Sequence, residues 1–385
     1  MNPMRRKATA FLTALLGAGA AIPACAQNAP QTFPSSAGPL AVEAVAKGLD
    51  HPWSLAFLPD GRMLVTERPG RLRIVTREGA LSPPVANVPQ VLARGQGGLL
   101  DVVLDRDYAR NRTIYFCYAE QMQGGGRTAM ARAVLQADNN PRLDDVKVIF
   151  RQEGPPSSSN HYGCRIVQMP DRNLFLTTGD HFTYRDEAQN LGNHLGKLIR
   201  IRPDGSVPPD NPFVGRAGAK PEIWSYGHRN MQGLAINPAS GKLWEQEHGP
   251  RGGDEINIPQ AGKNYGWPVI GYGVDYSGAR IHEDTHKAGM EQPVKYWVPS
   301  IAPSGMAFYT GDLFPQWKGS LFNGALVGTM LVRLSLDGEK VTGEERFLQP
   351  LGERIRDVRD GPDGALWLLT DNSDGRILRV VPAKR

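Results

Sequence analysis

The 385-residue chain lacks helical periodicity, a late membrane-spanning stretch and a basic surface, and each absence excludes a class of protein. It contains 44 glycines and 31 prolines, which interrupt helices and exclude a mostly helical fold. The net charge of +5 falls to about +2 once Arg5, Arg6 and Lys7 are set aside. No later run combines Lys or Arg with aromatic residues, so we expect no nucleic-acid partner.

The amino-terminal segment has the three parts of an export signal. Residues 1–7 are basic, residues 10–22 are apolar but too short to span a bilayer, and Ala24-x-Ala26 fits a cleavage site. No later stretch predicts a membrane span. The sequence therefore predicts an exported, periplasmic protein.

These features divide the chain into three parts. We expect a signal peptide over residues 1–26, a flexible leader over 27–40 and a single domain over 41–385. A lipid-modified Cys25 and a twin-arginine signal are alternatives, and Pro23 fits the lipid signal poorly.

Two cysteines follow the export signal. Cys117 lies in a strand-like segment, 113–118, and nothing in the sequence brings Cys164 close to it. An oxidising compartment would permit a bridge between them. We nevertheless expect two buried free thiols rather than a disulfide.

A strand-turn unit recurs along the chain. Each copy has a turn such as Pro-Asp-Gly, a short apolar strand with a polar end, and in the clearest copies a second turn and strand. The copies begin at Pro59, Met169, Asn237 and Gly361. Such scattered repeats favour an all-β propeller of six to eight blades, because a β-solenoid would need a shorter and stricter period.

Six polar segments interrupt this pattern, and a propeller can bring such segments together on one face. They contain Gln96, His161, the pair Arg229 and Asn230, the acidic loop 245–255, Tyr276, and the pair Arg354 and Arg356. Paired arginines on one side of a strand suit a polyanionic small molecule. The acidic, glycine-rich loop offers the hard oxygen ligands that calcium prefers.

One short motif matches a pattern for a function that its surroundings do not support. His282-Glu283-x-x-His286 matches a zinc-protease pattern, but that motif requires a helix. Gly278 and Gly289 flank it and no apolar helical stripe surrounds it, so a polar surface loop is expected instead.

Taken together and in this order, the six segments resemble the soluble pyrroloquinoline quinone (PQQ)-dependent sugar dehydrogenases, most closely the aldose sugar dehydrogenase branch. The resemblance runs from His51 to Val381 and is most specific over residues 226–233 and 245–268. It implies a six-bladed β-propeller that oxidises the anomeric carbon of aldoses to lactones, with PQQ and Ca²⁺ as cofactors. The natural electron acceptor stays unknown, and a monomer or homodimer is expected.

The resemblance also implies roles for individual residues. His161 matches the general base that accepts the proton of the anomeric hydroxyl. The positions that match contacts to the quinone are Gln96, Arg229, Asn230, Tyr276, Arg354 and Arg356. The positions that match calcium ligands are Gly249 and Pro250 for one ion and Glu255 and Tyr265 for a second.

Some positions depart from the family pattern. Asn160 precedes the base where some relatives have an acid, and Val327 stands where relatives place a lysine that contacts the cofactor. Asp180 and His181 are expected at the same mouth. Two other functions stay open: a calcium-dependent hydrolase such as a lactonase, which would not explain the arginines, and a binding propeller without catalysis.

Overall fold

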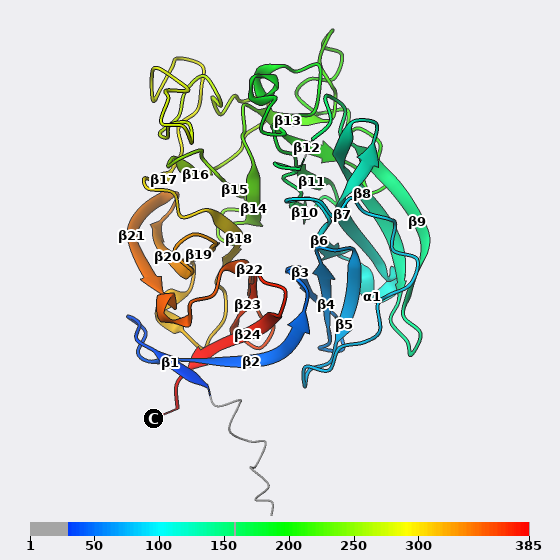
Figure 1. The fold of residues 1–385 in the computed structure, drawn as a ribbon, viewed down its shortest axis with the longest axis vertical. Coiled ribbons are helices and arrows are strands. Elements are labelled where there is room, and N and C mark those ends of the chain that lie inside the picture. The colour runs from blue at the N-terminus through cyan, green and yellow to red at the C-terminus, as the bar shows by residue number, and fades with distance from the viewer. Residues whose placement is uncertain (1–29, 158, 385) are drawn as a thin grey trace, which may run out of the picture.

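The computed structural model describes residues 30–157 and 159–384. Their strands form six sheets, which stand like blades around a central axis (Figure 1). The predicted all-β, six-bladed propeller is therefore confirmed. The export signal expected over residues 1–26 lies outside the described residues.

The first three blades follow one another along the chain. Blade 1 consists of β3 (Pro52–Phe57), β4 (Met63–Glu67) and β5 (Arg71–Val75). Blade 2 consists of β6 (Leu99–Leu104), β7 (Thr113–Met122), β8 (Gly125–Gln136) and β9 (Arg142–Arg151). Blade 3 consists of β10 (Ile166–Gln168), β11 (Leu174–Thr177), β12 (Lys197–Ile201) and β13 (Ile223–Tyr226).

The remaining blades complete the ring. Blade 4 consists of β14 (Met231–Ile236), β15 (Leu243–Glu247), β16 (Asp254–Asn257) and β17 (Lys295–Trp297). Blade 5 consists of β18 (Pro303–Phe308), β19 (Leu321–Ala325), β20 (Met330–Asp337) and β21 (Lys340–Phe347). Blade 6 consists of β22 (Ile355–Asp360), β23 (Leu366–Thr370), β24 (Gly375–Pro382), β2 (Leu40–Leu49) and β1 (Gln31–Phe33).

In residues 30–157 and 159–384, helical structure is confined to short turns. These are α1 (Tyr108–Asn111) and the 3-10 helices η2 (Arg185–Gln189), η3 (Pro315–Trp317) and η4 (Gln349–Leu351). In the described part of the chain, no helix has the length and apolar character needed to cross a membrane. The segment from His282 to His286 has no helix, as expected for a surface loop rather than a zinc-protease motif.

The recurring sequence unit builds the middle of a blade. In blade 1 the turn before β4 places Gly61 at φ +84°, a conformation that glycine adopts without steric cost. The Gly61 N–H donates to the carbonyl of Leu58 at 2.9 Å, which closes the turn. β4 then pairs with β5, as the apolar pattern on both sides of Gly70 predicts.

The hydrophobic core lies between neighbouring blades. Tyr115 and Met130 of blade 2, for example, pack in one cluster with Leu176 and Ile199 of blade 3. All four side chains are at most 1% exposed. Because each sheet is buried on both faces in this way, its middle strands are almost continuously apolar.

The ring closes by pairing strands from the two ends of the described chain. β2 lies between β1 and β24, so an early strand completes the sheet formed by the last three (Figure 1). Part of the segment 27–40, expected to be a flexible leader, forms a strand: Gln31–Phe33 is β1, and Phe33 is 6% exposed. The sequence does not reveal this pairing, because β1 is short and has polar flanks. Its hydrogen bonds come from the partner strand β2.

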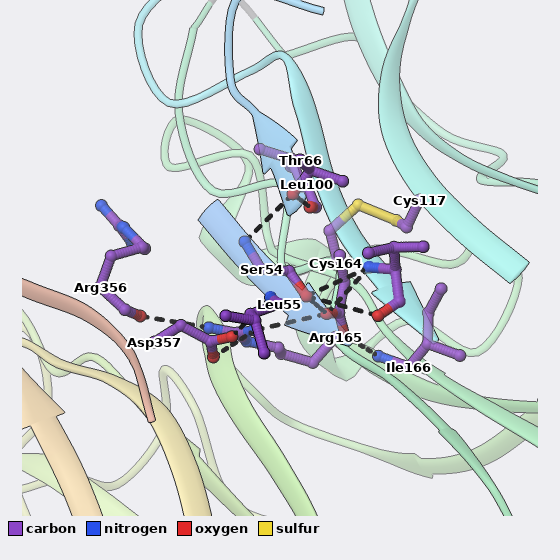
Figure 2. Close-up of polar contacts among 12 residues, drawn as sticks. Ser54, Leu55, Thr66, Leu100, Cys117, Cys164, Arg165, Ile166, Arg356 and Asp357 are labelled. Atoms are coloured by element: carbon purple, nitrogen blue, oxygen red, sulfur yellow. Dashed lines mark hydrogen bonds and ion pairs between the residues drawn. A yellow bond between two sulfur atoms is a disulfide. The ribbon is translucent and has the colours of Figure 1, made fainter. Parts of the chain in front are cut away.

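The prediction of two free thiols is wrong. Cys117 of β7 and Cys164, just before β10, form a disulfide with Cα atoms 5.7 Å apart (Figure 2). Both residues are fully buried. They are 47 positions apart in the sequence, and the segment between them spans most of blade 2, so only the packing of blade 2 against blade 3 brings them together.

A buried polar network joins the innermost strands around the axis. The Arg165 guanidinium lies 3.0 Å from a carboxylate oxygen of Asp357 (Figure 2). It also lies 3.4 Å from a carboxylate oxygen of Asp101 and stacks over the ring of Trp53. The Arg165 Nη2 also donates to the backbone carbonyl of Arg356 at 3.3 Å. These contacts fix blades 1, 2, 3 and 6 relative to one another beneath the candidate site.

Candidate active site

The candidate site residues come from loops at one end of the blades. Those placed just before an innermost strand, or at its start, are Gln96 for β6, His161 for β10, Arg229 and Asn230 for β14, and Arg354 and Arg356 for β22. Gly249 and Pro250 lie between β15 and β16. Because the innermost strands surround the axis, residues separated by up to 260 positions in sequence lie at one mouth.

His161 is held by a carboxylate. Its Nδ1 lies 2.6 Å from Oδ1 of Asp180, whose Oδ2 accepts a hydrogen bond from Nε1 of Trp267 at 2.7 Å. The Asp180 N–H donates to the carbonyl of Arg229. Among the described residues, His161 Nε2 has no hydrogen-bond partner. The pair thus leaves one ring nitrogen free for a proton of another molecule.

Its surroundings keep this imidazole uncharged, and therefore able to accept a proton. Burial lowers the pKa of His161, the positive charge of Arg229 lowers it further, and Asp180 opposes both effects. For Asp180, burial raises the pKa, but His161 and Arg229 lower it more, so that it falls below its ordinary value. At neutral pH the geometry therefore presents a neutral imidazole beside an ionised carboxylate.

The segment that carries His161 has an unusual backbone. His161, Gly163 and Cys164 have φ angles of +57°, +63° and +81°. Non-glycine residues rarely adopt such angles, so the surroundings must hold them in place. The Oε1 of Gln96 accepts the His161 N–H at 2.9 Å, and the disulfide anchors Cys164. Gln96 is thus in contact with the base in this structure.

Arg229 lies between the base and the acidic loop. Its Nη1 donates to the carbonyls of His248 and Gly249 at 3.0 and 2.7 Å, and its Nη2 lies 3.3 Å from the hydroxyl of Tyr276. The guanidinium also lies over the ring of Trp267. Arg229 is therefore in direct contact with two other expected site residues, Gly249 and Tyr276.

The amide of Asn230 is only partly satisfied. Its Oδ1 accepts hydrogen bonds from the Gly163 N–H and from Nε2 of Gln232. Its Nδ2 is buried and has no partner in the described part of the chain. Buried amides normally use their donors, so this nitrogen is available to donate to a molecule bound in the site.

Arg354 and Arg356 converge as their alternation predicts. Both guanidiniums contact Oδ2 of Asp371, at 3.1 and 2.9 Å. Burial raises the pKa of Asp371, but the two arginines outweigh it and lower that pKa to about 2. Arg356 also reaches Gln232, which links this pair to Asn230.

A cavity of 460 Å³ lies over these groups. Its lining includes Gln96, Gln232, Arg354, Arg356 and Val327. Three arginines, Arg68, Arg354 and Arg356, line it with one carboxylate, Asp371, so the cavity has an excess of positive charge. Val327 is 53% exposed and adds no charge to this lining.

The expected metal ligands surround a second, smaller cavity of 20 Å³. Its lining includes Gly249, Pro250, Glu255, Tyr265 and Arg229. Burial, and next the neighbouring Glu247 carboxylate, raise the pKa of Glu255 to about 8. Such a buried acid is well suited to a cation that would compensate its charge.

The sequence does not predict the contacts that two acids of this region, Asp180 and Asp371, make in the structure. Asp180 was expected only at the mouth, and Asp371 was not expected at the site. The repeat contains a signal for both, because Glu67, Asp180, Glu247 and Asp371 each stand at the polar end of a repeated strand. Each of the four carboxylates contacts an arginine or a histidine. Three contact its side chain, and Glu247 accepts a hydrogen bond from the backbone N–H of Arg229.

Comparison with known proteins places this geometry in a family. Residues 49–379 match the model of the Glucose / Sorbosone dehydrogenase family. The chain is 50% identical to the aldose sugar dehydrogenase YliI of Escherichia coli K12 over 345 residues, which cover 89% of this chain and 92% of the relative.

Solved structures agree. A glucose dehydrogenase crystal structure has 52% identity and a TM-score of 0.87, covering 89% of this chain and 99% of that one. The PQQ-bound aldose sugar dehydrogenase of Streptomyces coelicolor has 31% identity and a TM-score of 0.74, covering 89% and 98%. The chain therefore belongs to the glucose and sorbosone dehydrogenase family, an oxidoreductase family that acts on sugars.

Proposed function

We propose that the protein is a calcium- and PQQ-dependent aldose sugar dehydrogenase that oxidises the anomeric carbon to a lactone. The observation that carries this proposal is the pairing of His161 with Asp180 beside Arg229, next to a cationic cavity. The PQQ-bound relative supports the identity of the cofactor.

The residues present fit the quinone. It carries three carboxylates, which suit the guanidiniums of Arg354 and Arg356. The Nδ2 of Asn230 and the Nε of Arg356 are buried without a partner in the described part of the chain, and they could donate to it. When bound, the quinone supplies the acceptor for the hydride that leaves the anomeric carbon.

Calcium fits the acidic loop. The carbonyls of Gly249 and Pro250 would hold one ion near Arg229, and Glu255 and Tyr265 would hold a second. Arg229 already donates to the Gly249 carbonyl, so ion and arginine would share this oxygen. Their positive charges would stabilise negative charge that develops close to them.

The protein's own residues then handle the proton. His161 Nε2 accepts it from the anomeric hydroxyl, and Asp180 holds the ring through Nδ1 and stabilises the imidazolium that forms. Without Asp180 the buried charge would be unfavourable beside Arg229. Base, carboxylate and arginine therefore act as one unit.

The test is reduction of an artificial dye by the purified, metal-stripped protein, with PQQ, Ca²⁺ and a panel of aldoses added in turn. Turnover that needs all three components supports the proposal, and His161→Ala should abolish turnover while quinone binding persists. Quinone binding without turnover would contradict it in favour of a binding propeller. Absence of quinone binding would contradict it in favour of a calcium-dependent hydrolase.

We also propose that the enzyme acts in the periplasm and passes electrons to an acceptor still to be identified. The disulfide between Cys117 and Cys164 supports export, because such bonds persist in oxidising compartments. Detection of the enzyme in the osmotic-shock fraction of the producing cell tests this location.

A further inference from the structure

We propose that the Phe182 ring is the surface on which the apolar face of the aldose ring packs during oxidation. This inference rests on the proposed function and adds a residue that determines substrate binding. Phe182 is 44% exposed and follows Asp180 and His181 directly in the chain. The proposal comes from its position, its backbone and the chemistry of sugars.

Phe182 lies beside the groups that would act on the substrate. Its ring centroid is 5.2 Å from that of His161, with the rings nearly perpendicular, and 6.2 Å from that of Tyr276. The Tyr276 hydroxyl is in turn 3.3 Å from Arg229 Nη2. Phe182 thus stands between the base and the aromatic neighbour of Arg229. A sugar whose hydroxyl reaches His161 Nε2 brings its ring to the neighbourhood of Phe182.

The backbone at this position is strained although the Phe182 ring is only partly buried. His181 and Phe182 have φ angles of +57° and +62°. A bulky side chain rarely adopts such an angle, and an exposed ring returns little hydrophobic stabilisation. Backbone strain of this kind persists only where the surrounding structure imposes it, and it is frequent at functional sites.

The surroundings do enforce it. The Phe182 N–H donates to Oδ1 of Asp180 at 2.8 Å, the same oxygen that contacts His161. The His181 ring lies between two oxygens, with Nδ1 2.7 Å from the carbonyl of Pro155 and Nε2 2.8 Å from Oε1 of Gln152. The base and the aromatic ring are therefore positioned by one carboxylate.

The chemistry of aldoses explains why an aromatic ring would be useful here. The charged and polar groups of the site recognise hydroxyls, whereas each face of a pyranose also presents C–H groups. A flat apolar ring packs against such a face and gains contact area without requiring a hydrogen bond. Because this contact is the same before and during the reaction, it should affect KM rather than kcat.

The experiment compares Phe182→Ala with the wild-type holoenzyme, loaded with PQQ and Ca²⁺, over a series of aldose concentrations. We expect KM to rise about tenfold to thirtyfold, as for loss of most of a buried phenyl contact, with kcat changed by less than about threefold. Phe182→Tyr should restore KM. Quinone binding titrated without sugar should be unchanged.

A matched control is Tyr184→Ala, which removes another exposed aromatic ring of the same loop and should leave KM unchanged. If Phe182→Ala instead lowers kcat and shifts the pH profile at constant KM, Phe182 shields the base and the inference is wrong. An unchanged KM also overturns it. Failure of the proposed function is distinct, because the wild type would then show no quinone-dependent turnover with any aldose, and the inference would fall with it.

Discussion

At the scale of single residues, the pKa of His161 is set by burial and by two charged neighbours of opposite effect. Burial and Arg229 favour the neutral imidazole, whereas Asp180 favours the charged one. The net pKa lies below the ordinary value for histidine, which is about 6.5. A base with a lowered pKa stays deprotonated, and so competent, at more acidic pH.

The acidic limb of kcat/KM should therefore lie below pH 6.5, since that limb reports the base of the free enzyme. Asp180→Asn removes the one neighbour that raises the pKa of His161, so the limb should move to still lower pH. The variant should also lose about 10²- to 10⁴-fold in kcat, because the ring loses its orienting carboxylate. Initial rates between pH 4 and 9 measure both effects.

Asp186→Asn is the matched control, because Asp186 belongs to the same loop and its side chain is 90% exposed. It should leave the profile unchanged. A wild-type limb at or above pH 6.5, or an Asp180→Asn limb displaced upwards, would contradict the electrostatic account.

At the scale of elements, the segment between residues 161 and 164 depends on contacts from other blades. Its positive φ angles are unfavourable by themselves, and Gln96, Asn230 and Cys117 hold it from three sides. Cys117 alone does so through a covalent bond. The disulfide is thus placed to affect both stability and the position of the base.

Replacing Cys117 and Cys164 together with serine should lower the free energy of unfolding by about 2 to 4 kcal/mol, the usual effect of a disulfide that closes a loop of this length. The disulfide joins two residues that are 47 positions apart in the chain. Denaturant unfolding of the variant and the wild type measures the loss. Wild-type protein treated with reductant under native conditions should resist change, because both sulfurs are buried.

Equal unfolding midpoints for variant and wild type would show that the bond adds no stability. A loss in the variant that also appears in the wild type under mild reductant would show that the sulfurs are accessible, against the burial seen here.

At the scale of the whole molecule, the propeller is closed by β2, which pairs with β24 from the other end of the sequence. Leu40 of this strand is fully buried in a cluster with residues of blades 5 and 6. Early and late parts of the chain must therefore meet before the ring is complete.

Leu40→Ala should lower the free energy of unfolding by about 2 to 5 kcal/mol, since it leaves a cavity at the closing seam. Lys47→Ala is the control, because it changes an exposed residue of the same strand. Thermal and denaturant unfolding compare the two. If the variants are equally stable, β2 contributes little to closure.

The sequence by itself determined the fold class, the family and the identity of most candidate groups. Turns followed by apolar strands are local signals, since glycine, proline and strand formers act on the backbone beside them. The alternation of Arg354 and Arg356 likewise placed both on one side of a strand, where the structure brings them together at Asp371.

Only the tertiary structure decided which distant groups meet. Asp180 lies 19 positions from His161, and the pairing of Cys117 with Cys164 and the order of β1 depend on neighbouring strands. The repeat places Asp180 at the polar end of a strand, but no pattern in the sequence shows which distant residue each of these groups contacts. The physical reason is that a propeller fixes them through packing between blades, and this packing joins surfaces rather than consecutive residues.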